Sequence, residues 1–303
     1  MVAALRRARV AGTVCVLAVA VPAPAAAFCR TNTCEQEPDN PDCHFDPVTG
    51  CLSGGEWLYW DTSCVAFSVQ ANASPLRHIT YGEAVDTVFE AMSLWADARC
   101  DGEPVAIEPV LFPAVACDKV EFNINRSEGP NANVWMFRDD EWPYDDEVGV
   151  DTLALTSVWF NVETGQIYDA DVEINSHDTA LDGKDGPTLL EIASHEAGHV
   201  YGLAHSSLPD AIMFTMYSPT AAISASLTRD DEQGICSAYP PGPTAAACDP
   251  TPRNGFGPEC GGKAPSCQAA GPAKPRDGAI WAAAAALLLF RGRRSTGRPA
   301  RLT

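Results

Sequence analysis

One stretch of eleven residues restricts this chain more than any other, because it reads H-E-x-x-H-x-x-G-x-x-H from His195 to His205. Residues four apart share one face of a helix, so His195 and His199 can direct their imidazoles at a single ion. Gly202 can adopt a left-handed backbone that ends the helix and brings His205 back as a third ligand. Three protein ligands and one open position are typical of a catalytic zinc site. Glu196 is then free to take a proton from an attacking water.

The ordinary alternative is that these histidines are core or surface residues, and a bare H-E-x-x-H does arise by chance. Three histidines, a glutamate and a glycine at this spacing form a far more restrictive pattern. The stretch also holds three of the six histidines in the chain. We therefore interpret it as a zinc site. His177, alone in a loop-like segment, is more typical of a solvated histidine than of a further ligand.

The motif and the residues after it resemble the metzincin zinc peptidases, and among them the matrixins. Residues 206–214 read S-S-L-P-D-A-I-M-F, which is similar to the matrixin continuation S-x-x-P-x-A-[LI]-M-[YF]. This resemblance implies that Met213 lies in a tight turn, the Met-turn, beneath the zinc. Met216 is the rival, although either methionine can be an ordinary core residue. Tyr217 stands four residues after Met213 and is not assigned as a ligand.

The resemblance covers about residues 57–240 and implies an α+β catalytic domain with a twisted mixed sheet, an active-site helix and a Met-turn. The pattern of apolar residues predicts strands over 64–69, 105–107, 120–124, 153–161 and 167–175, the last two paired around a turn at 163–165, and a helix over 83–98. The active-site helix is expected over about 189–201, after a turn-rich break at 182–187. Residues 227–235 resemble the closing helix of the matrixins, with acidic residues in its first turn. Thr188 and Glu191 form a capping-box pattern at the start of the active-site helix. The strand at 169–175 resembles the edge strand that pairs with an extended substrate in matrixins.

Residues 134–151 are interpreted as a loop that carries a cluster of acidic side chains. These are Asp139, Asp140, Glu141, Asp145, Asp146 and Glu147. Such a cluster is most often a solvated loop. Because calcium prefers several carboxylate oxygens, a Ca²⁺ site is the alternative here.

The first 27 residues have the features of a secretory signal peptide. Arg6, Arg7 and Arg9 precede an apolar run over 10–21, and Ala25 to Ala27 offers a cleavage site. The apolar run is too short to span a membrane comfortably. We therefore expect the protein to be secreted or to reach the cell surface, with cleavage after Ala27.

Export makes the cysteines disulfide candidates, since they are oxidised outside the cytosol. Of 12 cysteines, Cys15 leaves with the signal peptide, and the odd number that remains implies one thiol with another task. Residues 28–56 are expected to form a Cys-rich N-terminal extension, in which nothing resembles the cysteine-switch propeptide of matrixins. Residues 241–277, rich in Pro, Gly and Ala, are expected to form a linker.

The charge of the chain bears on its partners. Residues 28–277 hold all 40 acidic residues and 12 of the 20 basic ones, so their formal net charge is −28. This argues against nucleic acid as a partner, because phosphate binding calls for a basic surface. The simplest consequence of the acidity is solubility.

Residues 278–303 contain a short apolar run, 279–290, followed by an Arg cluster at 291–294. A cysteine, an apolar stretch and terminal arginines resemble the myxobacterial C-terminal sorting tail, MYXO-CTERM. That resemblance implies a sorting protease acting near Cys267 and anchoring at the membrane or cell surface. Twelve apolar residues do not span a bilayer unaided, so a disordered or membrane-associated terminus is the alternative.

Together these features predict a zinc-dependent endopeptidase that acts on extracellular proteins or peptides. Zinc on His195, His199 and His205 would polarise the scissile carbonyl, and Glu196 would act as general base and then return the proton to the leaving amine. A catalytically inert surface binding or adhesion protein that retains the zinc site is the first alternative. A zinc hydrolase acting on a non-peptide bond is the second.

Overall fold

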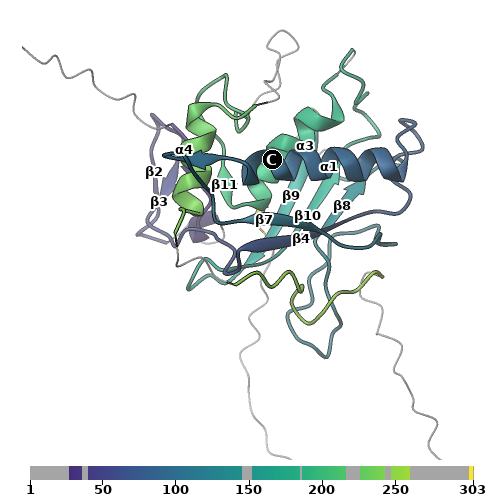
Figure 1. Cartoon of the computed structure of the whole chain (residues 1–303), viewed down its shortest axis with the longest axis horizontal. Coiled ribbons are helices and arrows are strands. Elements are labelled where there is room, and N and C mark those ends of the chain that lie inside the picture. The colour runs from purple at the N-terminus through teal and green to yellow at the C-terminus, as the bar shows by residue number, and fades with distance from the viewer. Residues whose placement is uncertain are drawn as a thin grey trace, which may run out of the picture.

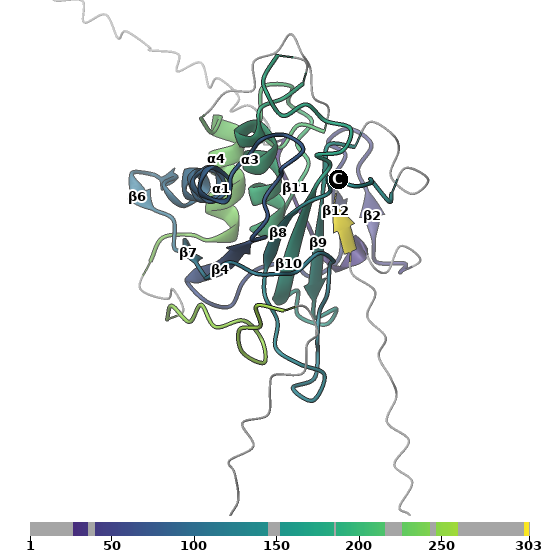
Figure 2. The same ribbon diagram turned by 90° about the vertical axis from the view of Figure 1, so that its right-hand side faces the viewer.

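A mixed β-sheet forms the centre of the molecule, and the long helices among the described residues lie on one face of that sheet (Figures 1 and 2). The structure is a computed structural model, and it describes residues 27–35, 40–144, 152–184, 186–215, 226–242, 247–259 and 300–302. The expected α+β class with a mixed sheet is confirmed. None of the helices in these described ranges is long and apolar enough to cross a membrane.

The sheet has six strands in the order β12-β9-β10-β8-β4-β7. Their bounds are β4 Cys64–Val69, β7 Glu108–Leu111, β8 Val134–Phe137, β9 Ala154–Phe160, β10 Ile167–Ile174 and β12 Ala300–Leu302. The strands from β7 to β10 are parallel to their neighbours, whereas β9 is antiparallel to both β10 and β12. The hairpin predicted around Gly165 is therefore confirmed as β9 and β10, and Gly165 has a φ of +75°.

The prediction that residues 169–175 form the edge strand is wrong. Strand β10 pairs with β8 on one side and with β9 on the other, so no edge of β10 is available to a substrate. Among the long strands at this end of the sheet β9 is the outermost, and the three residues of β12 pair with its outer edge. The residue pattern of the hairpin does not reveal which of its two strands faces outward.

Three other expectations about strands are wrong. Residues 134–137 form the central strand β8, fully buried, rather than the start of a loop. Residues 120–124 form no strand, and the strand expected at 105–107 begins three residues later as β7. A strand buried on both faces has no polar alternation, so the run Val-Trp-Met-Phe lacks the period-2 signal on which the prediction relied.

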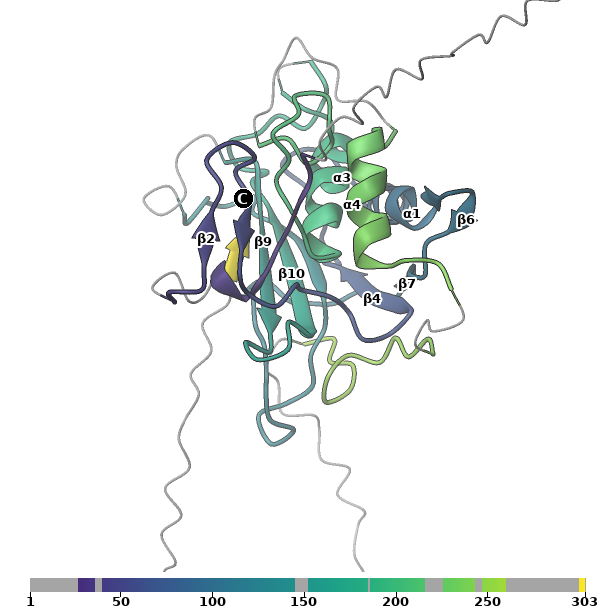
Figure 3. The same cartoon turned by 90° about the vertical axis from the view of Figure 1, so that its left-hand side faces the viewer.

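In the described part of the chain, three helices cover one face of the sheet, α1 (Tyr81–Ala96), α3 (Leu189–Val200) and α4 (Arg229–Ala238), and Figure 3 shows them on the same side. Each begins with a capping box in which a threonine and an acidic residue three positions on exchange hydrogen bonds with the backbone. The predicted pair of Thr188 and Glu191 is thereby confirmed. Helix α1 packs against α3, and Trp95 Nε1 donates to Ser194 O at 2.8 Å.

The N-terminal extension consists of short strands, β1 (Cys29–Arg30), β2 (His44–Phe45) and β3 (Leu52–Ser53), and a 3₁₀ turn, η1 (Thr33–Glu35). Disulfides Cys29–Cys51 and Cys34–Cys43 staple it. A further short hairpin, β5 (Arg99–Cys100) and β6 (Glu103–Pro104), follows α1. Cys100 is bonded to Cys236 of α4.

Part of the segment expected to be a linker lies against the sheet. Cys248 is disulfide-bonded to Cys64 at the start of β4. The guanidinium of Arg253 lies over the ring of Tyr168, 4.2 Å from its centroid. Asn131 hydrogen-bonds through Nδ2 to Arg253 O, and Phe256 packs against a cluster of apolar residues below β8. Residues 247–259 therefore add contacts to the domain.

Candidate metal centre

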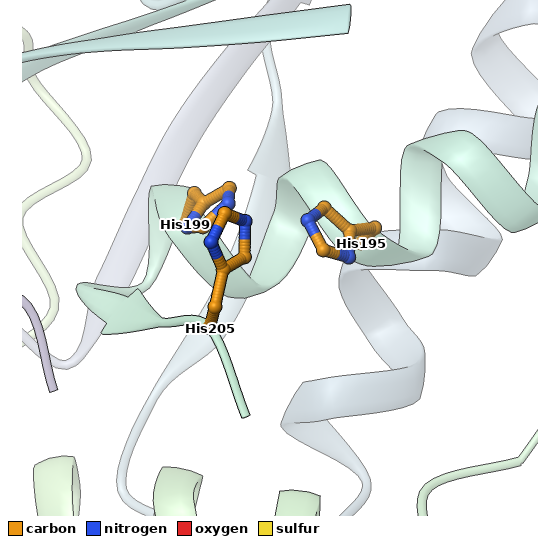
Figure 4. Close-up of side chains that lie close together, drawn as sticks. All are labelled: His195, His199 and His205. Atoms are coloured by element: carbon orange, nitrogen blue, oxygen red, sulfur yellow. The ribbon is translucent and has the colours of Figure 1, made fainter. Parts of the chain in front are cut away.

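His195, His199 and His205 lie together, two on α3 and one on the segment after it (Figure 4). The ring centroids of His195 and His199 are 4.9 Å apart, as are those of His199 and His205, and His195 to His205 measures 5.2 Å. One nitrogen of each ring lies within 4.8 Å of the others. Within the described ranges this is the one such group of His, Cys, Asp or Glu side chains that could hold a metal ion.

Backbone carbonyls orient two of the rings. His195 Nδ1 lies 2.7 Å from Ile212 O, and His199 Nδ1 lies 2.8 Å from Leu203 O. A carbonyl oxygen can only accept, so Nδ1 carries the proton and leaves the Nε2 lone pair for a metal. Nε2 of His199 and of His205 is buried without a hydrogen-bond partner in the described part of the chain. These orphaned nitrogens fit a divalent ion that prefers imidazole, such as zinc.

The electrostatic environment keeps the imidazoles neutral. Burial lowers the pKa of His195 and holds the pKa of His199 well below its usual value. It lowers the pKa of His205 to about 3. For His199 and His205, the neighbouring histidines lower the pKa further. Neutral imidazole is the form that binds a metal, so no proton has to be displaced from the rings at physiological pH.

The end of α3 turns sharply, and this turn separates the third histidine from the first two. Gly202 has a φ of +86°, which confirms the predicted left-handed backbone. A Cβ there would lie 2.8 Å from Leu58 O, so both conformation and space require glycine. The last carbonyls of the helix accept from side chains: Val200 O from Trp60 Nε1 at 2.8 Å and Tyr201 O from the Tyr239 hydroxyl at 3.0 Å.

The segment that carries His205 is held by the N-terminal extension and by α4. Residues 203–204 form β11, which pairs antiparallel with β1. Ser206 Oγ donates to Asp230 Oδ2 at 2.6 Å, and Asp230 Oδ1 accepts from the backbone amides of Ala27 and Phe28. Two elements from opposite ends of the domain thus fix the backbone next to the third imidazole.

Met213 lies against α3, next to the candidate metal centre. A Cβ on Gly198 would lie 2.2 Å from Met213 Sδ, so the glycine in the middle of the motif leaves room for the thioether. Asp231 accepts hydrogen bonds from the backbone amides of Ile212 and Met213 through its two oxygens. Ser206 N donates to Met213 O at 2.8 Å, which closes the loop between His205 and the methionine. Gly198 and Asp231 are site residues that the sequence reasoning missed.

Glu196 is 3% exposed and points toward the sheet rather than to open solvent. Burial raises the pKa of its carboxyl to about 8, and the hydrogen bond from the Thr156 hydroxyl opposes that rise. The distance from Thr156 Oγ1 to Glu196 Oε2 is 2.5 Å. Thr156 was also missed, because a threonine in a strand is common and its pattern gives no sign of a polar contact.

The other candidate residues lie elsewhere. His177 is exposed, and its Nδ1 pairs with Asp178 at 2.7 Å. Both carboxylate oxygens of Asp139 accept hydrogen bonds, from the hydroxyls of Ser74 and Ser176 and from the Leu76 amide. This carboxylate therefore stabilises the neighbouring loops. Asp145, Asp146, Glu147, Met216 and Tyr217 lie outside the described residues. The calcium site remains a prediction.

Comparison with known proteins agrees with this geometry. The family model described as Matrixin matches residues 59–240. Human neutrophil collagenase is 26% identical over 204 residues, which are 63% of this chain and 38% of the collagenase. Human stromelysin-3 is 28% identical over 214 residues, 69% of this chain and 36% of that protein. Matrix metalloproteinase-2 of Drosophila melanogaster is 42% identical over 72 residues, 24% of this chain and 9% of its own length.

The chain spans less than two fifths of the length of each of these three relatives. The matched segment begins just before β4 and ends at the close of α4, so it includes the sheet strands from β4 to β10, the three helices and all three imidazoles. Since this match takes in more than half of the sequence and the whole metal centre, the chain belongs to the matrixin family.

Proposed function

We propose that this protein is a secreted or surface-anchored zinc-dependent endopeptidase that hydrolyses peptide bonds of extracellular proteins. The observation that carries the proposal is the meeting of three neutral imidazoles, two of them on α3, with a buried glutamate that also lies on α3. Membership of a family of zinc peptidases supports it. The names of the relatives, a collagenase and a stromelysin, describe those proteins and leave the substrate of this chain open.

In this proposal His195, His199 and His205 hold the zinc, which when bound would supply a Lewis acid for the scissile carbonyl and for water activation. Glu196 accepts a proton from the attacking water and delivers it to the leaving amine. Its burial supports this role, because a raised pKa brings the carboxyl close to the operating range of a general acid and base. Met213 supports the backbone beneath the imidazoles.

An extended peptide is proposed to pair with the outer edge of β9. Thr156, which contacts Glu196, belongs to β9, so a peptide along this edge would lie next to the general base. Residues 300–302 of the chain pair antiparallel with β9 at 156–158, and this pairing supports an edge that accepts an added strand. Main-chain pairing of this kind is a common mode of peptide binding.

The direct test is metal analysis of the purified full chain beside a digest of casein and of a peptide library. We expect about one zinc per chain, cleavage of peptides, and loss of cleavage after chelation that zinc restores. A truncated chain that ends at residue 259, assayed beside the full chain, shows whether the strand at 300–302 competes with the substrate for the edge of β9. Zinc-loaded protein that cleaves no peptide would favour the inert binding protein. Hydrolysis confined to non-peptide esters or amides would favour the second alternative.

Export and attachment are further parts of the proposal. Four disulfides join pairs of described cysteines, and Cys117 is disulfide-bonded as well. This pattern supports an oxidising compartment. We expect the mature protein to begin at Phe28, and a sorting protease to process the tail near Cys267. Intact-mass measurement on protein from the medium and from the cell surface tests both ends. A mature chain that retains residues 1–27 would contradict the signal peptide.

A further inference from the structure

The Glu196 carboxylate has one protein partner in the described part of the chain, and that partner lies forty residues earlier, on the sheet. Thr156 Oγ1 donates to Glu196 Oε2 at 2.5 Å. Both side chains are buried, Thr156 completely. The other oxygen, Oε1, accepts no hydrogen bond from the described residues, so the contact engages one side of the carboxylate and leaves the second available.

Packing alone does not explain why residue 156 carries a hydroxyl group. Residues of β9 that face the helices alternate with those that face away, and Thr156 stands between Ala154 and Val158 on the helix-facing side. Its neighbour across the hairpin is Val172. A valine would fill the same space without a polar atom. A fully buried hydroxyl needs a hydrogen-bond partner to offset its lost hydration, and Glu196 is that partner.

The backbone on both sides of this contact is rigid. Thr156 lies within a strand paired with β10, and Glu196 lies within α3, which has a capping box at its start and side-chain donors to the carbonyls at its end. A glutamate side chain has several rotatable bonds, so its helix alone does not fix where the carboxylate points. A hydrogen bond from the strand removes that freedom. Holding a catalytic group in place in this way can change a rate strongly, since small misplacements are costly.

We propose that Thr156 is a positioning residue, which holds Glu196 Oε2 so that Oε1 meets the attacking water. This inference rests on the proposed peptidase function and adds to it a residue from the sheet. Thr156 acts only through Glu196, and it neither binds the metal nor touches the reacting atoms.

The test uses the full chain with Thr156→Val, which keeps the shape and removes the hydroxyl, and Thr156→Ser, which keeps the hydroxyl. We expect Thr156→Val to lower kcat by about 10- to 100-fold with KM and zinc content unchanged. Thr156→Ser should stay within about threefold of the unaltered protein. The matched control is Thr87→Val on α1, which makes the same change at a threonine whose hydroxyl donates to the Glu83 carbonyl of its own helix, and it should leave kcat unchanged.

A double variant shows whether Thr156 acts through Glu196. Adding Thr156→Val to Glu196→Gln should cause no further loss of kcat, because the group that Thr156 positions is already inactive. A further independent loss of about tenfold would overturn the proposal. Full kcat in Thr156→Val, or equal losses in the valine and serine variants, would overturn it as well.

A second measurement needs no catalysis. Thermal unfolding of the metal-free protein is measured for Thr156→Val, Glu196→Ala and the double variant, since alanine, unlike glutamine, cannot accept the hydrogen bond from Thr156. The Tm shift of the double variant should differ from the sum of the single shifts. Additive shifts would show that the contact is absent. If the unaltered protein cleaves nothing, the peptidase proposal fails while this cycle still reports on the contact. If Thr156→Val does not fold, the serine and alanine variants still provide the comparison.

Discussion

The two faces of the β9–β10 hairpin are both buried, yet they hold their polar side chains differently. On the face toward α3 the polar residue of β9 is Thr156, and it is paired with Glu196. On the opposite face β10 presents three buried acids in a row, Asp169, Asp171 and Glu173. The first face has one polar contact next to the candidate metal centre, and the second has a row of three buried acidic side chains beneath the loop from β7 to β8.

The three acids of the outer face differ in their partners. Glu173 accepts from the Arg138 guanidinium and from the Tyr144 hydroxyl at 2.8 Å. Asp171 accepts from the backbone amides of Glu121 and Val134. Neither oxygen of Asp169 has a hydrogen-bond partner among the described residues. The comparison teaches that burial alone does not define a functional site, because what distinguishes Glu196 is the arrangement of the groups around it.

The largest effect is expected on the metal-facing side. Glu196→Gln should retain zinc and fold but lower kcat by about 10²- to 10⁴-fold, because the amide cannot accept the proton from water. Metal content, far-UV circular dichroism and a peptide assay measure the three properties together. Turnover near that of the unaltered protein would show that the buried carboxyl of this face has no catalytic role.

A change at Glu173 should affect stability rather than catalysis. Glu173→Gln leaves Arg138, whose side chain is only 16% exposed, without its anionic partner. Breaking a buried ion pair costs about 3 kcal/mol, so we expect a loss of about 2 to 3 kcal/mol in urea unfolding, with kcat/KM unchanged for the folded fraction. Replacing both partners, as Glu173→Gln with Arg138→Met, should recover part of that loss. A large drop in kcat/KM would contradict the separation of the two faces.

A substitution at Asp169 should raise the stability of the protein, whereas Glu173→Gln should lower it. Burial, followed by the charges of Asp171 and Glu121, raises the pKa of Asp169 well above its ordinary value. The folded state therefore binds a proton that the unfolded state releases once the pH exceeds about 4, so this residue lowers stability as the pH rises.

We expect Asp169→Asn to stabilise the protein by about 1 kcal/mol or more at pH 8. The difference should disappear below about pH 4, where Asp169 is protonated in both states. Urea unfolding at about pH 4, 6 and 8 measures this. A variant that is less stable at the highest pH would show that Asp169 is ionised and has a partner.

The smallest effect is expected at Ser157, whose buried hydroxyl has no hydrogen-bond partner in the described part of the chain. Ser157→Ala removes an unpaired polar group, so the free energy of unfolding should change by less than about 0.5 kcal/mol, or rise slightly. Thr156→Val, one residue away, should in contrast lower kcat. A loss above about 1 kcal/mol for Ser157→Ala would mean that the hydroxyl has a partner.

Local patterns in the sequence determined the parts of this protein that depend on neighbouring residues. The spacing of His195, Glu196, His199 and Gly202 predicts a helix with imidazoles on one face and a left-handed turn at its end, and the structure has both. The capping box at Thr188 and the hairpin around Gly165 were predictable for the same reason. Such features are set by backbone geometry over a few residues.

Tertiary structure alone decided what depends on distant segments. The order of strands placed β9 rather than β10 outermost and made residues 134–137 a buried central strand. It also brought Thr156 to Glu196 and Asp231 to the backbone at Met213. A strand looks the same in sequence whichever neighbour it pairs with, and a threonine or aspartate gives no local sign of its partner. The motif therefore determined which residues can hold a metal, and long-range packing determined how they are held.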